Sequence, residues 1–307
     1  MEQDRIYDMV IVGGGPGGYT AALYAARAGL SAVVLERMSP GGQMAQTHMI
    51  DNYPGFHEGI DGFQLGEQMR LQAERFGAET VFTQVNRVEL AGKIKKIQTD
   101  SGEFLGRTMV YAAGAGPKKL GLPMEEELVG RGVAYCAACD GMFYRGKTVV
   151  VVGGGNSAAA DALLLSRVAG KVILVHRRDA FRAAKAEQLA LQKAENVEYL
   201  MNSQVIRLEH ERKLTGVTVQ NNITGEELQI PCDGIFISIG RKPAAELVAG
   251  QLEMDAAGYL LAGEDTKTNI PGVYAVGDVR SKPVRQIVTA TSDGAVAVAM
   301  AEQYLAE

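Results

Sequence analysis

The sequence contains no tryptophan, few cysteines and histidines, and no long run of apolar residues or of one charge sign. Its formal net charge of −5 gives no indication of a basic nucleic-acid-binding surface. No apolar stretch reaches the roughly 20 residues that a membrane span needs. Met1–Arg5 leads straight into a strand-like segment without the apolar core of a signal peptide. We therefore expect a soluble, cytoplasmic protein that binds neither nucleic acid nor membrane.

The three cysteines, Cys136, Cys139 and Cys232, are too few and odd in number for a secreted disulfide scaffold. A structural zinc site needs about four ligands, but there is no second cysteine pair and the four histidines are scattered. The sequence therefore predicts no metal site. In a reducing compartment, a close cysteine pair is more often catalytic than structural.

Glycine, by contrast, is abundant, with 37 residues, many of which follow runs of valine and isoleucine. Residues 10–18 read VIVGGGPGG and residues 150–158 read VVVGGGNSA, an offset of 140. At the same offset the strand-like segment Ser31–Glu36 falls on Lys171–His176. Each copy is a β-branched run, a glycine turn, an alanine-rich helix and a second apolar strand, which is the pattern of a dinucleotide-binding βαβ unit. A length of 307 residues fits two such domains.

The glycine positions have separate physical roles in this unit. Gly13 permits the tight turn out of the strand, and Gly15 lets the backbone approach a pyrophosphate. Gly18, or Ala158 in the second copy, lets the helix pack close to the strand. The N–H groups at the start of the helix then face the phosphate charge.

The two copies differ at the end of the second strand. The first ends at Glu36, a carboxylate that suits a ribose diol and would repel a 2′-phosphate. The second ends at His176, followed by Arg177, Arg178 and Arg182, and guanidinium groups form charge-assisted bonds with phosphate. We therefore interpret the first site as an FAD (or NAD) site and the second as an NADPH site. The alternative is that the basic segment is only a solvated surface patch.

The C-terminal part of the chain indicates a discontinuous first domain. Thr268–Asp278 is a further strand-like segment that ends in a Gly-Asp pair, and a helix-like segment follows at Ala290–Tyr304. We predict an α/β fold of two Rossmann-like, ββα-type domains. Residues 1–116 and 246–307 form the FAD-binding domain, and residues 117–245 form an inserted NADPH-binding domain that carries the cysteine pair. Gly114–Leu122 and Gly240–Pro243 are the expected crossovers.

Cys136 and Cys139 lie three residues apart in YCAACDG, shortly before the second nucleotide-binding strand. Such a pair can close a small disulfide ring that reopens readily, and the thiolate is the attacking species. Asp140 is a candidate acid–base group beside the pair. The alternative is two buried thiols that happen to be close. Cys232 falls in an apolar segment, and we expect it to be an inert core residue in a strand.

Taken together, these motifs resemble the bacterial, low-molecular-weight thioredoxin reductase family, class II of the pyridine nucleotide-disulfide oxidoreductases, over essentially the whole chain. The matching segments are 13–18 (GGGPGG), 41–43 (GGQ), 51–55 (DNYPG), 113–115 (AGA), 136–140 (CAACD), 153–158 (GGGNSA), 176–179 (HRRD) with Arg182, and 277–278 (GD) with 285–286 (RQ).

The resemblance implies a homodimer that transfers electrons from NADPH through FAD and the cysteine pair to thioredoxin or a thioredoxin-like protein. It implies that Cys139 faces the flavin, that Cys136 attacks the partner disulfide and that Asp140 handles the proton. The family also rotates its NADPH-binding domain, and glycines in the crossovers are compatible with such a hinge. FAD contacts are implied for Gly15, Glu36, Gln43, Asn52, Asp278 and Gln286. NADPH contacts are implied for Gly155, Asn156, Ser157, His176, Arg177, Arg178 and Arg182. Further cofactor-binding positions are Gly13, Pro16, Gly18, Arg37, Gly42, Val85, Ala113, Gly114, Gly240, Gly277, Arg285 and Ile287.

The sequence departs from the family pattern at Ala160, where an acidic residue is common, and at Ala244, where asparagine is common. Neither change removes a phosphate ligand. Three other functions are alternatives to the main prediction. A thiol oxidase or ferredoxin-fed reductase on this scaffold tends to lose the arginines that this chain keeps. A related flavin reductase could use another thioredoxin-like acceptor. A non-catalytic redox sensor would carry a signalling module, and none is recognisable here.

Overall fold

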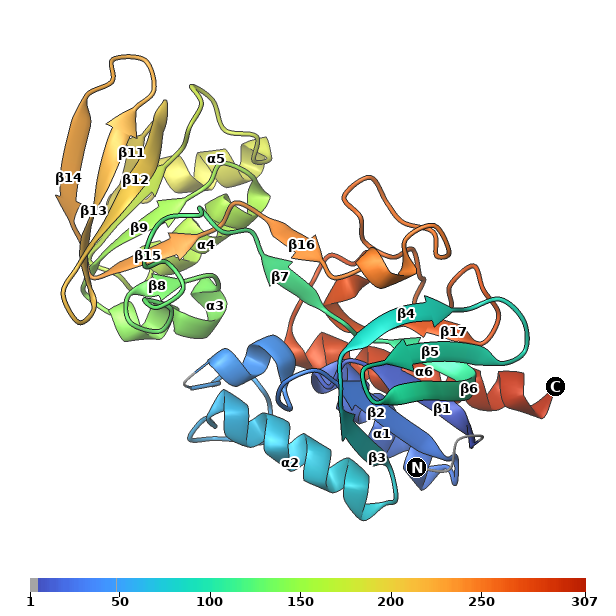
Figure 1. Ribbon diagram of the computed structural model, residues 1–307. Helices are drawn as coiled ribbons and strands as arrows, with labels where there is room; N and C mark the ends of the chain where they lie inside the picture. The colour runs from blue at the N-terminus through green and yellow to red at the C-terminus, as the bar shows by residue number, and fades with distance from the viewer. Residues whose placement is uncertain (1–4, 48) are drawn as a thin grey trace. The chain divides into compact units, whose positions relative to one another are not determined.

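The computed structural model describes residues 5–47 and 49–307, which divide into two compact units (Figure 1). Unit 1 comprises Met1–Gly116 and Lys242–Glu307, and unit 2 is Pro117–Arg241. The expectation about the N-terminal residues before Arg5 and the observation on His48 concern positions outside the described residues. No helix in the described part of the chain is long and apolar enough to span a membrane.

The second boundary lies four residues before the predicted one, at Arg241 instead of Ala245. The reason is a set of contacts that bind residues 242–245 to unit 1. The Tyr111 hydroxyl donates to the Ala244 carbonyl over 2.8 Å, and the Ala244 N–H donates to the Gly114 carbonyl over 3.0 Å. Ala245 is buried in the unit 1 core.

Unit 1 is built on a mixed sheet whose strands run in the order β3-β2-β1-β6-β5-β4, with β17 also paired to β6. Strands β1, β2, β3, β6 and β17 are parallel, and β4 and β5 are antiparallel additions at one edge. The strand bounds are β1 Ile6–Val12, β2 Ala32–Glu36, β3 Glu79–Phe82, β4 Val85–Glu89, β5 Lys95–Thr99, β6 Gly102–Tyr111 and β17 Val273–Ala275. The helices are α1 Pro16–Arg27, α2 Gly62–Arg75 and α6 Ile287–Ala306, with short 3-10 turns η1 Gly42–Gln46, η3 Glu246–Val248 and η4 Gly277–Val279.

Successive side chains of β1 point to opposite faces of this sheet, and each face is covered by its own hydrophobic core. Met9 and Ile11 pack against the helices, while Val10 and Val12 pack on the opposite face. Strands buried on both faces are typical of parallel sheets, which explains the continuous apolar runs in the sequence. Helices α1 and α6 pack so closely that a Cβ on Gly294 would overlap the Gly17 carbonyl. The C-terminal segment thus completes unit 1, although β17 is shorter than the strand-like segment that the sequence indicated.

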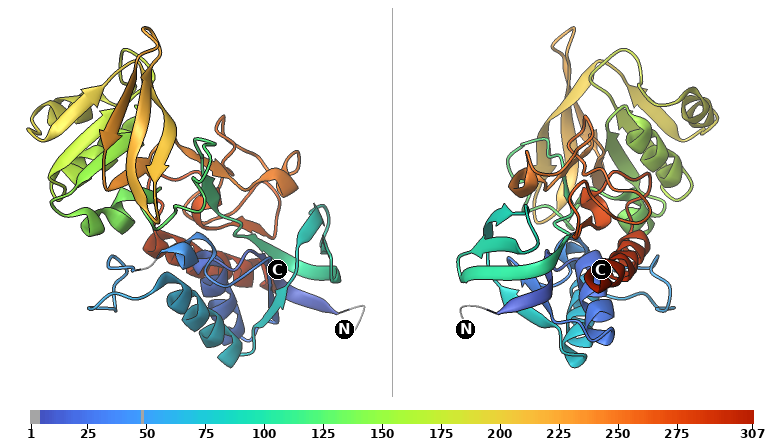
Figure 2. Two further views of the ribbon diagram at one scale, coloured as in Figure 1. Left: turned by 60° about the vertical axis from the view of Figure 1, so that its left-hand side comes forward. Right: turned by 90° about the vertical axis from the view of Figure 1, so that its right-hand side faces the viewer.

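Unit 2 repeats the pattern on a parallel sheet in the order β11-β10-β9-β15-β8, with a separate antiparallel sheet β12-β13-β14 (Figures 1 and 2). The parallel strands are β8 Val133–Ala134, β9 Thr148–Val152, β10 Lys171–Val175, β11 Val197–Leu200 and β15 Gly234–Ile237. The antiparallel strands are β12 Ser203–His210, β13 Leu214–Asn221 and β14 Glu227–Pro231. The helices are α3 Ala137–Asp140, α4 Asn156–Ser166 and α5 Lys185–Gln192, with η2 Gly141–Tyr144.

Two short strands, β7 Ala115–Pro117 and β16 Arg241–Pro243, pair where the chain passes between the units. The Lys118 N–H donates to the Gly240 carbonyl over 2.9 Å. Both crossovers therefore lie within the segments that the sequence suggested, and both are held by backbone hydrogen bonds.

Candidate active site

The first glycine loop joins β1 to α1 as the repeat predicted. Gly13 has a φ of +104°, and a Cβ there would lie 2.6 Å from the Ala112 carbonyl oxygen. A Cβ on Gly18 would overlap the Gly13 carbonyl, so the helix packs directly on the loop. Gly15, the N-cap of α1, faces open space, and a Cβ added there would have no heavy atom within 4 Å. The start of α1 therefore offers backbone N–H groups to an anion, and Pro16 follows as its first residue.

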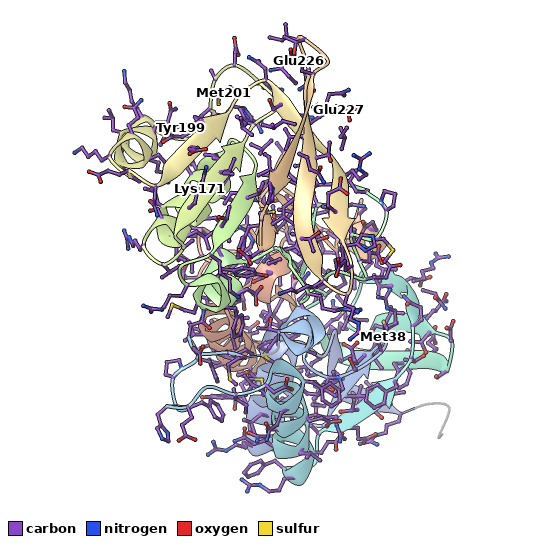
Figure 3. The ribbon with its side chains drawn as sticks, turned by 90° about the vertical axis from the view of Figure 1, so that its left-hand side faces the viewer. Met38, Lys171, Tyr199, Met201, Glu226 and Glu227 are labelled. Carbon is purple, nitrogen blue, oxygen red and sulfur yellow. A yellow bond between two sulfur atoms is a disulfide. The ribbon has the colours of Figure 1, made fainter. Side chains whose placement is uncertain are left out.

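Glu36 lies at the mouth of this loop and is held by the backbone. One carboxylate oxygen accepts the Gly14 N–H over 2.7 Å, and the other accepts the N–H of Met38 over 3.0 Å. Met38 itself is a surface residue, 74% exposed (Figure 3). Since a carboxylate has about four acceptor positions, Glu36 keeps acceptor capacity for a ribose diol. The loop and this acid fit the adenosine half of a dinucleotide such as FAD.

Several further positions predicted to contact FAD gather around this loop. A Cβ on Gly42 would lie 3.6 Å from the Gly15 Cα, and one on Gly13 would lie 3.2 Å from the Ala113 Cα. The Gln43 amide donates to the Ala115 carbonyl. The Asn52 amide donates to the Gln286 side-chain oxygen over 3.1 Å, although these residues lie 234 positions apart.

The remaining predicted FAD positions are spread over unit 1. Gln286 caps α6, whose first residue is Ile287, and the Arg285 guanidinium lies 4.0 Å from the Tyr259 ring centre. Gly277 and Asp278 form η4 directly after β17. Val85 is a buried core residue at the start of β4, and Arg37 is exposed. Their contacts with a cofactor stay predictions.

The second glycine loop, between β9 and α4, has the same design. A Cβ on Gly153 would lie 2.7 Å from the Ala158 Cβ, and Gly155 again faces open space at the helix N-cap. Two hydrogen bonds fasten the basic segment to this loop. The Arg182 N–H donates to the Gly154 carbonyl over 2.7 Å, and the Asn156 side-chain oxygen accepts the Ala184 N–H over 2.8 Å.

The three arginines and His176 are placed differently. The side chains of Arg177, Arg178 and Arg182 are exposed, and none forms an ion pair with another described residue. His176 is only 4% exposed. Its ring occupies the space where a Gly154 Cβ would lie, stacks on Phe181 and has Nε2 3.1 Å from the Ala180 carbonyl. The arginine side chains are thus available to a phosphate, whereas the imidazole packs against the backbone of the glycine loop at Gly154.

Burial, together with the nearby arginines, lowers the pKa of His176. The imidazole is therefore neutral near pH 7. A neutral ring that packs against the backbone adds no charge to the basic segment. Any attraction for a 2′-phosphate in this region comes from Arg177, Arg178 and Arg182.

Cys136 and Cys139 form a disulfide with their Cα atoms 5.3 Å apart. Cys136 caps α3, and its carbonyl accepts the N–H groups of Cys139 and Asp140 over 3.3 and 3.1 Å. Both cysteines are half-buried, and Ala138 between them is exposed. A half-buried disulfide in a single helical turn is accessible to an attacking thiolate.

Asp140, the predicted acid–base group, directly follows the cysteine pair. Burial raises the pKa of its carboxyl group to about 6. An acid with a pKa near the working pH can both give and accept a proton efficiently. The carboxyl group is therefore suited to protonate a leaving thiolate.

The prediction for Cys232 was right about its burial but wrong about its place in a strand. Cys232 lies between β14 and β15 because Asp233 turns the chain and binds the Thr148 N–H over 3.1 Å. The thiol is 6% exposed, and burial raises its pKa to about 12. It is a thiol without nucleophilic character at neutral pH.

Sequence reasoning missed a buried charged cluster beside η4. Asp293 accepts the Gly277 N–H over 2.9 Å, and its carboxylate pairs with Arg280 over 2.8 Å and with Lys282 over 2.7 Å. All three side chains are at most 7% exposed. The cluster holds the η4 turn, which contains Asp278. A lone aspartate within the alanine-rich and valine-rich α6 was the available signal, because an acid on such a helix needs a partner.

A family model described as pyridine nucleotide-disulphide oxidoreductase matches residues 7–294. The chain belongs to this family. Among relatives of this pyridine nucleotide-disulphide oxidoreductase, a thioredoxin reductase of Mycolicibacterium smegmatis is 43% identical over 98% of this chain and 97% of its own length. One of Bacillus subtilis is 43% identical over 100% and 97%. The crystal structure of thioredoxin reductase from Streptococcus pyogenes, 39% identical, covers 98% of each chain with a TM-score of 0.90.

Proposed function

We propose that this protein is an NADPH-dependent, FAD-containing thioredoxin reductase. The observation that carries the proposal is the half-buried Cys136–Cys139 disulfide beside Asp140, in the same unit as a nucleotide loop flanked by exposed arginines. Full-length similarity to thioredoxin reductases supports it. Unit 1 is proposed as the FAD-binding domain and unit 2 as the NADPH-binding domain.

FAD, when bound, supplies a relay that takes a hydride from the nicotinamide and delivers an electron pair to the disulfide. The residues for this group are those of the first loop with Glu36, and those for NADPH are the second loop with its arginines. Arg177, Arg178 and Arg182 bind the 2′-phosphate, which gives the preference for NADPH over NADH.

The chain's own chemistry is thiol–disulfide exchange. The Cys136 thiolate attacks one sulfur of the thioredoxin disulfide, so that a mixed disulfide forms and the other thioredoxin sulfur leaves as a thiolate. The Cys139 thiolate then attacks the Cys136 sulfur, which releases the second thioredoxin thiolate and restores the Cys136–Cys139 disulfide. Asp140 gives the proton that neutralises a departing thiolate.

NADPH oxidation with a panel of thioredoxins tests this function, together with the variants Cys136→Ser and Cys139→Ser. Each variant should abolish thioredoxin reduction and leave flavin reduction by NADPH intact. Cys232→Val is the matched control and should keep full activity, because its thiol is buried and inert. Normal turnover by either serine variant, or loss of flavin from both, would refute the catalytic role of the pair.

Homodimer formation and a cytoplasmic location belong to the same proposal. The family resemblance supports the dimer, and a cysteine content of one redox pair and one buried thiol suits a reducing compartment. Light scattering of the purified holoenzyme should give a mass near twice 32.8 kDa. A mass of one chain at micromolar concentration would contradict the dimer.

A further inference from the structure

Glu125 is a buried acid near the redox pair that the mechanism above does not use. It is 2% exposed, and its carboxylate accepts four hydrogen bonds. One oxygen accepts the Leu120 N–H over 3.0 Å and the Tyr135 hydroxyl over 2.7 Å. The other accepts the N–H groups of Gly121 and Leu122 over 2.8 and 3.2 Å.

These four donors fill the acceptor capacity of a carboxylate. All four are neutral, so the negative charge is stabilised by dipoles. An amide in its place would offer one oxygen and would direct N–H groups at N–H groups. The site therefore requires an acid, and such a fully satisfied network is rigid.

The network joins two segments that matter for the redox pair. Leu120–Leu122 follows the crossover strand β7, and Tyr135 directly precedes Cys136. The Tyr135 ring packs on the same core cluster as Leu120 and Leu122. At Cys136 the chain changes from β8 into the single turn of α3, with no side-chain cap to hold it. The Tyr135 hydroxyl is the side-chain anchor immediately before this change of direction.

We propose that the Glu125–Tyr135 hydrogen bond positions the redox disulfide, by fixing the backbone at Cys136 so that its sulfur stays within reach of Cys139. This inference rests on the proposed function, since it assigns two positioning residues to the same cysteine pair. Holding the two sulfurs close favours the disulfide over the open dithiol. It also speeds the attack of Cys139 on a mixed disulfide at Cys136.

Tyr135→Phe tests the proposal, because it removes only the hydroxyl and leaves the ring in the core. The thiol–disulfide equilibrium of the holoenzyme is measured under anaerobic conditions against defined ratios of reduced and oxidised dithiothreitol, with alkylation of free thiols. We expect a shift toward the dithiol of about fivefold to tenfold, the equilibrium weight of one hydrogen bond. We expect thioredoxin turnover to fall by a similar factor, with KM for NADPH and flavin reduction by NADPH unchanged.

Tyr199→Phe is the matched control, since Tyr199 lies on β11 of the same unit with its side chain at the surface (Figure 3). It should leave the equilibrium unchanged. In a Glu125→Ala background, Tyr135→Phe should add no further shift, because the hydroxyl has lost its acceptor. An unchanged equilibrium in Tyr135→Phe would overturn the inference. Because dithiothreitol replaces thioredoxin in this measurement, failure of the wild-type protein to reduce thioredoxin would count against the proposed function alone.

Discussion

The two glycine loops share one backbone design but are completed by opposite chemistry. In unit 1 the strand after the loop ends at Glu36, whose two oxygens bind the backbone N–H groups of Gly14 and Met38. In unit 2 the corresponding residue, His176, is buried beneath Gly154, and exposed arginines follow it. With FAD assigned to unit 1 and NADPH to unit 2, as proposed above, the loop would bind the phosphates common to both nucleotides, and the end of the next strand would distinguish a ribose diol from a 2′-phosphate.

Gly18 in unit 1 and Ala158 in unit 2 occupy the same position in their loops. Substitutions at this position should show the largest difference between the units. Gly18→Ala places a methyl group against the Gly13 carbonyl, which is backbone and cannot rotate away. We expect a loss of flavin binding and destabilisation of unit 1 by about 1–3 kcal/mol. Flavin absorbance per chain and thermal unfolding measure both effects.

The reciprocal change, Ala158→Gly, is the control for that experiment. Unit 2 already accommodates a methyl group at this position, so the change should cost only about 1 kcal/mol, the helix penalty of glycine. Equal flavin loss in the two variants would show that the loops are not independent.

The arginines provide the second test of the comparison. Arg178→Gln removes a charge-assisted bond to the 2′-phosphate, so kcat/KM for NADPH should fall about 10- to 100-fold while kcat/KM for NADH stays constant. Steady-state kinetics with both cofactors give the ratio. Arg212→Gln, on the exposed turn between β12 and β13 of the same unit, should change neither value. A parallel fall with NADH would mean that Arg178 supports the fold and not the phosphate.

The last test concerns pH and unit 2, which alone carries the redox pair. Burial raises the pKa of Asp140 to about 6 from the ordinary aspartate value of 3.8. Between these values the folded state binds more protons than the unfolded state, so the free energy of unfolding should decrease as pH rises from about 4 to 6. Asp140→Asn should abolish this decrease, which is on the order of 2 kcal/mol. Thermal unfolding across this pH range is the measurement, and the exposed Asp179→Asn should keep the wild-type slope.

Most of the fold could be predicted from local patterns in the sequence. The strands and helices of both βαβ units lie where the repeat predicted, because apolar periodicity and glycine turns act over short segments. Long-range pairing was harder to predict. Residues 242–245 join unit 1 through Tyr111 and Gly114, and Cys232 lies in a turn set by Asp233. Neither contact leaves a signal in the neighbouring sequence.

The candidate site could be located from the sequence where a short local motif marks it, while the contacts of its residues with cofactors stay predictions. The cysteine pair, the two loops and the arginines carry such motifs. His176 differs, because its burial depends on the absence of a side chain at Gly154. Glu125 and Asp293 were missed for a different reason. Three of the four donors to Glu125 are backbone N–H groups of the preceding turn, which no residue type reveals. The partners of Asp293, Arg280 and Lys282, lie outside its helix, and an acid on a helix is usually solvated.

The division of unit 1 into two stretches of chain has a consequence for synthesis on the ribosome. Until residues 242–307 emerge, β6 lacks its neighbour β17, and α1 lacks the cover of α6. Unit 2, which is continuous, can fold first, while the nascent N-terminal segment still has an open sheet edge and an apolar helix face. The unit whose synthesis begins first would then fold last, and chaperone demand should be highest while unit 2 is being made.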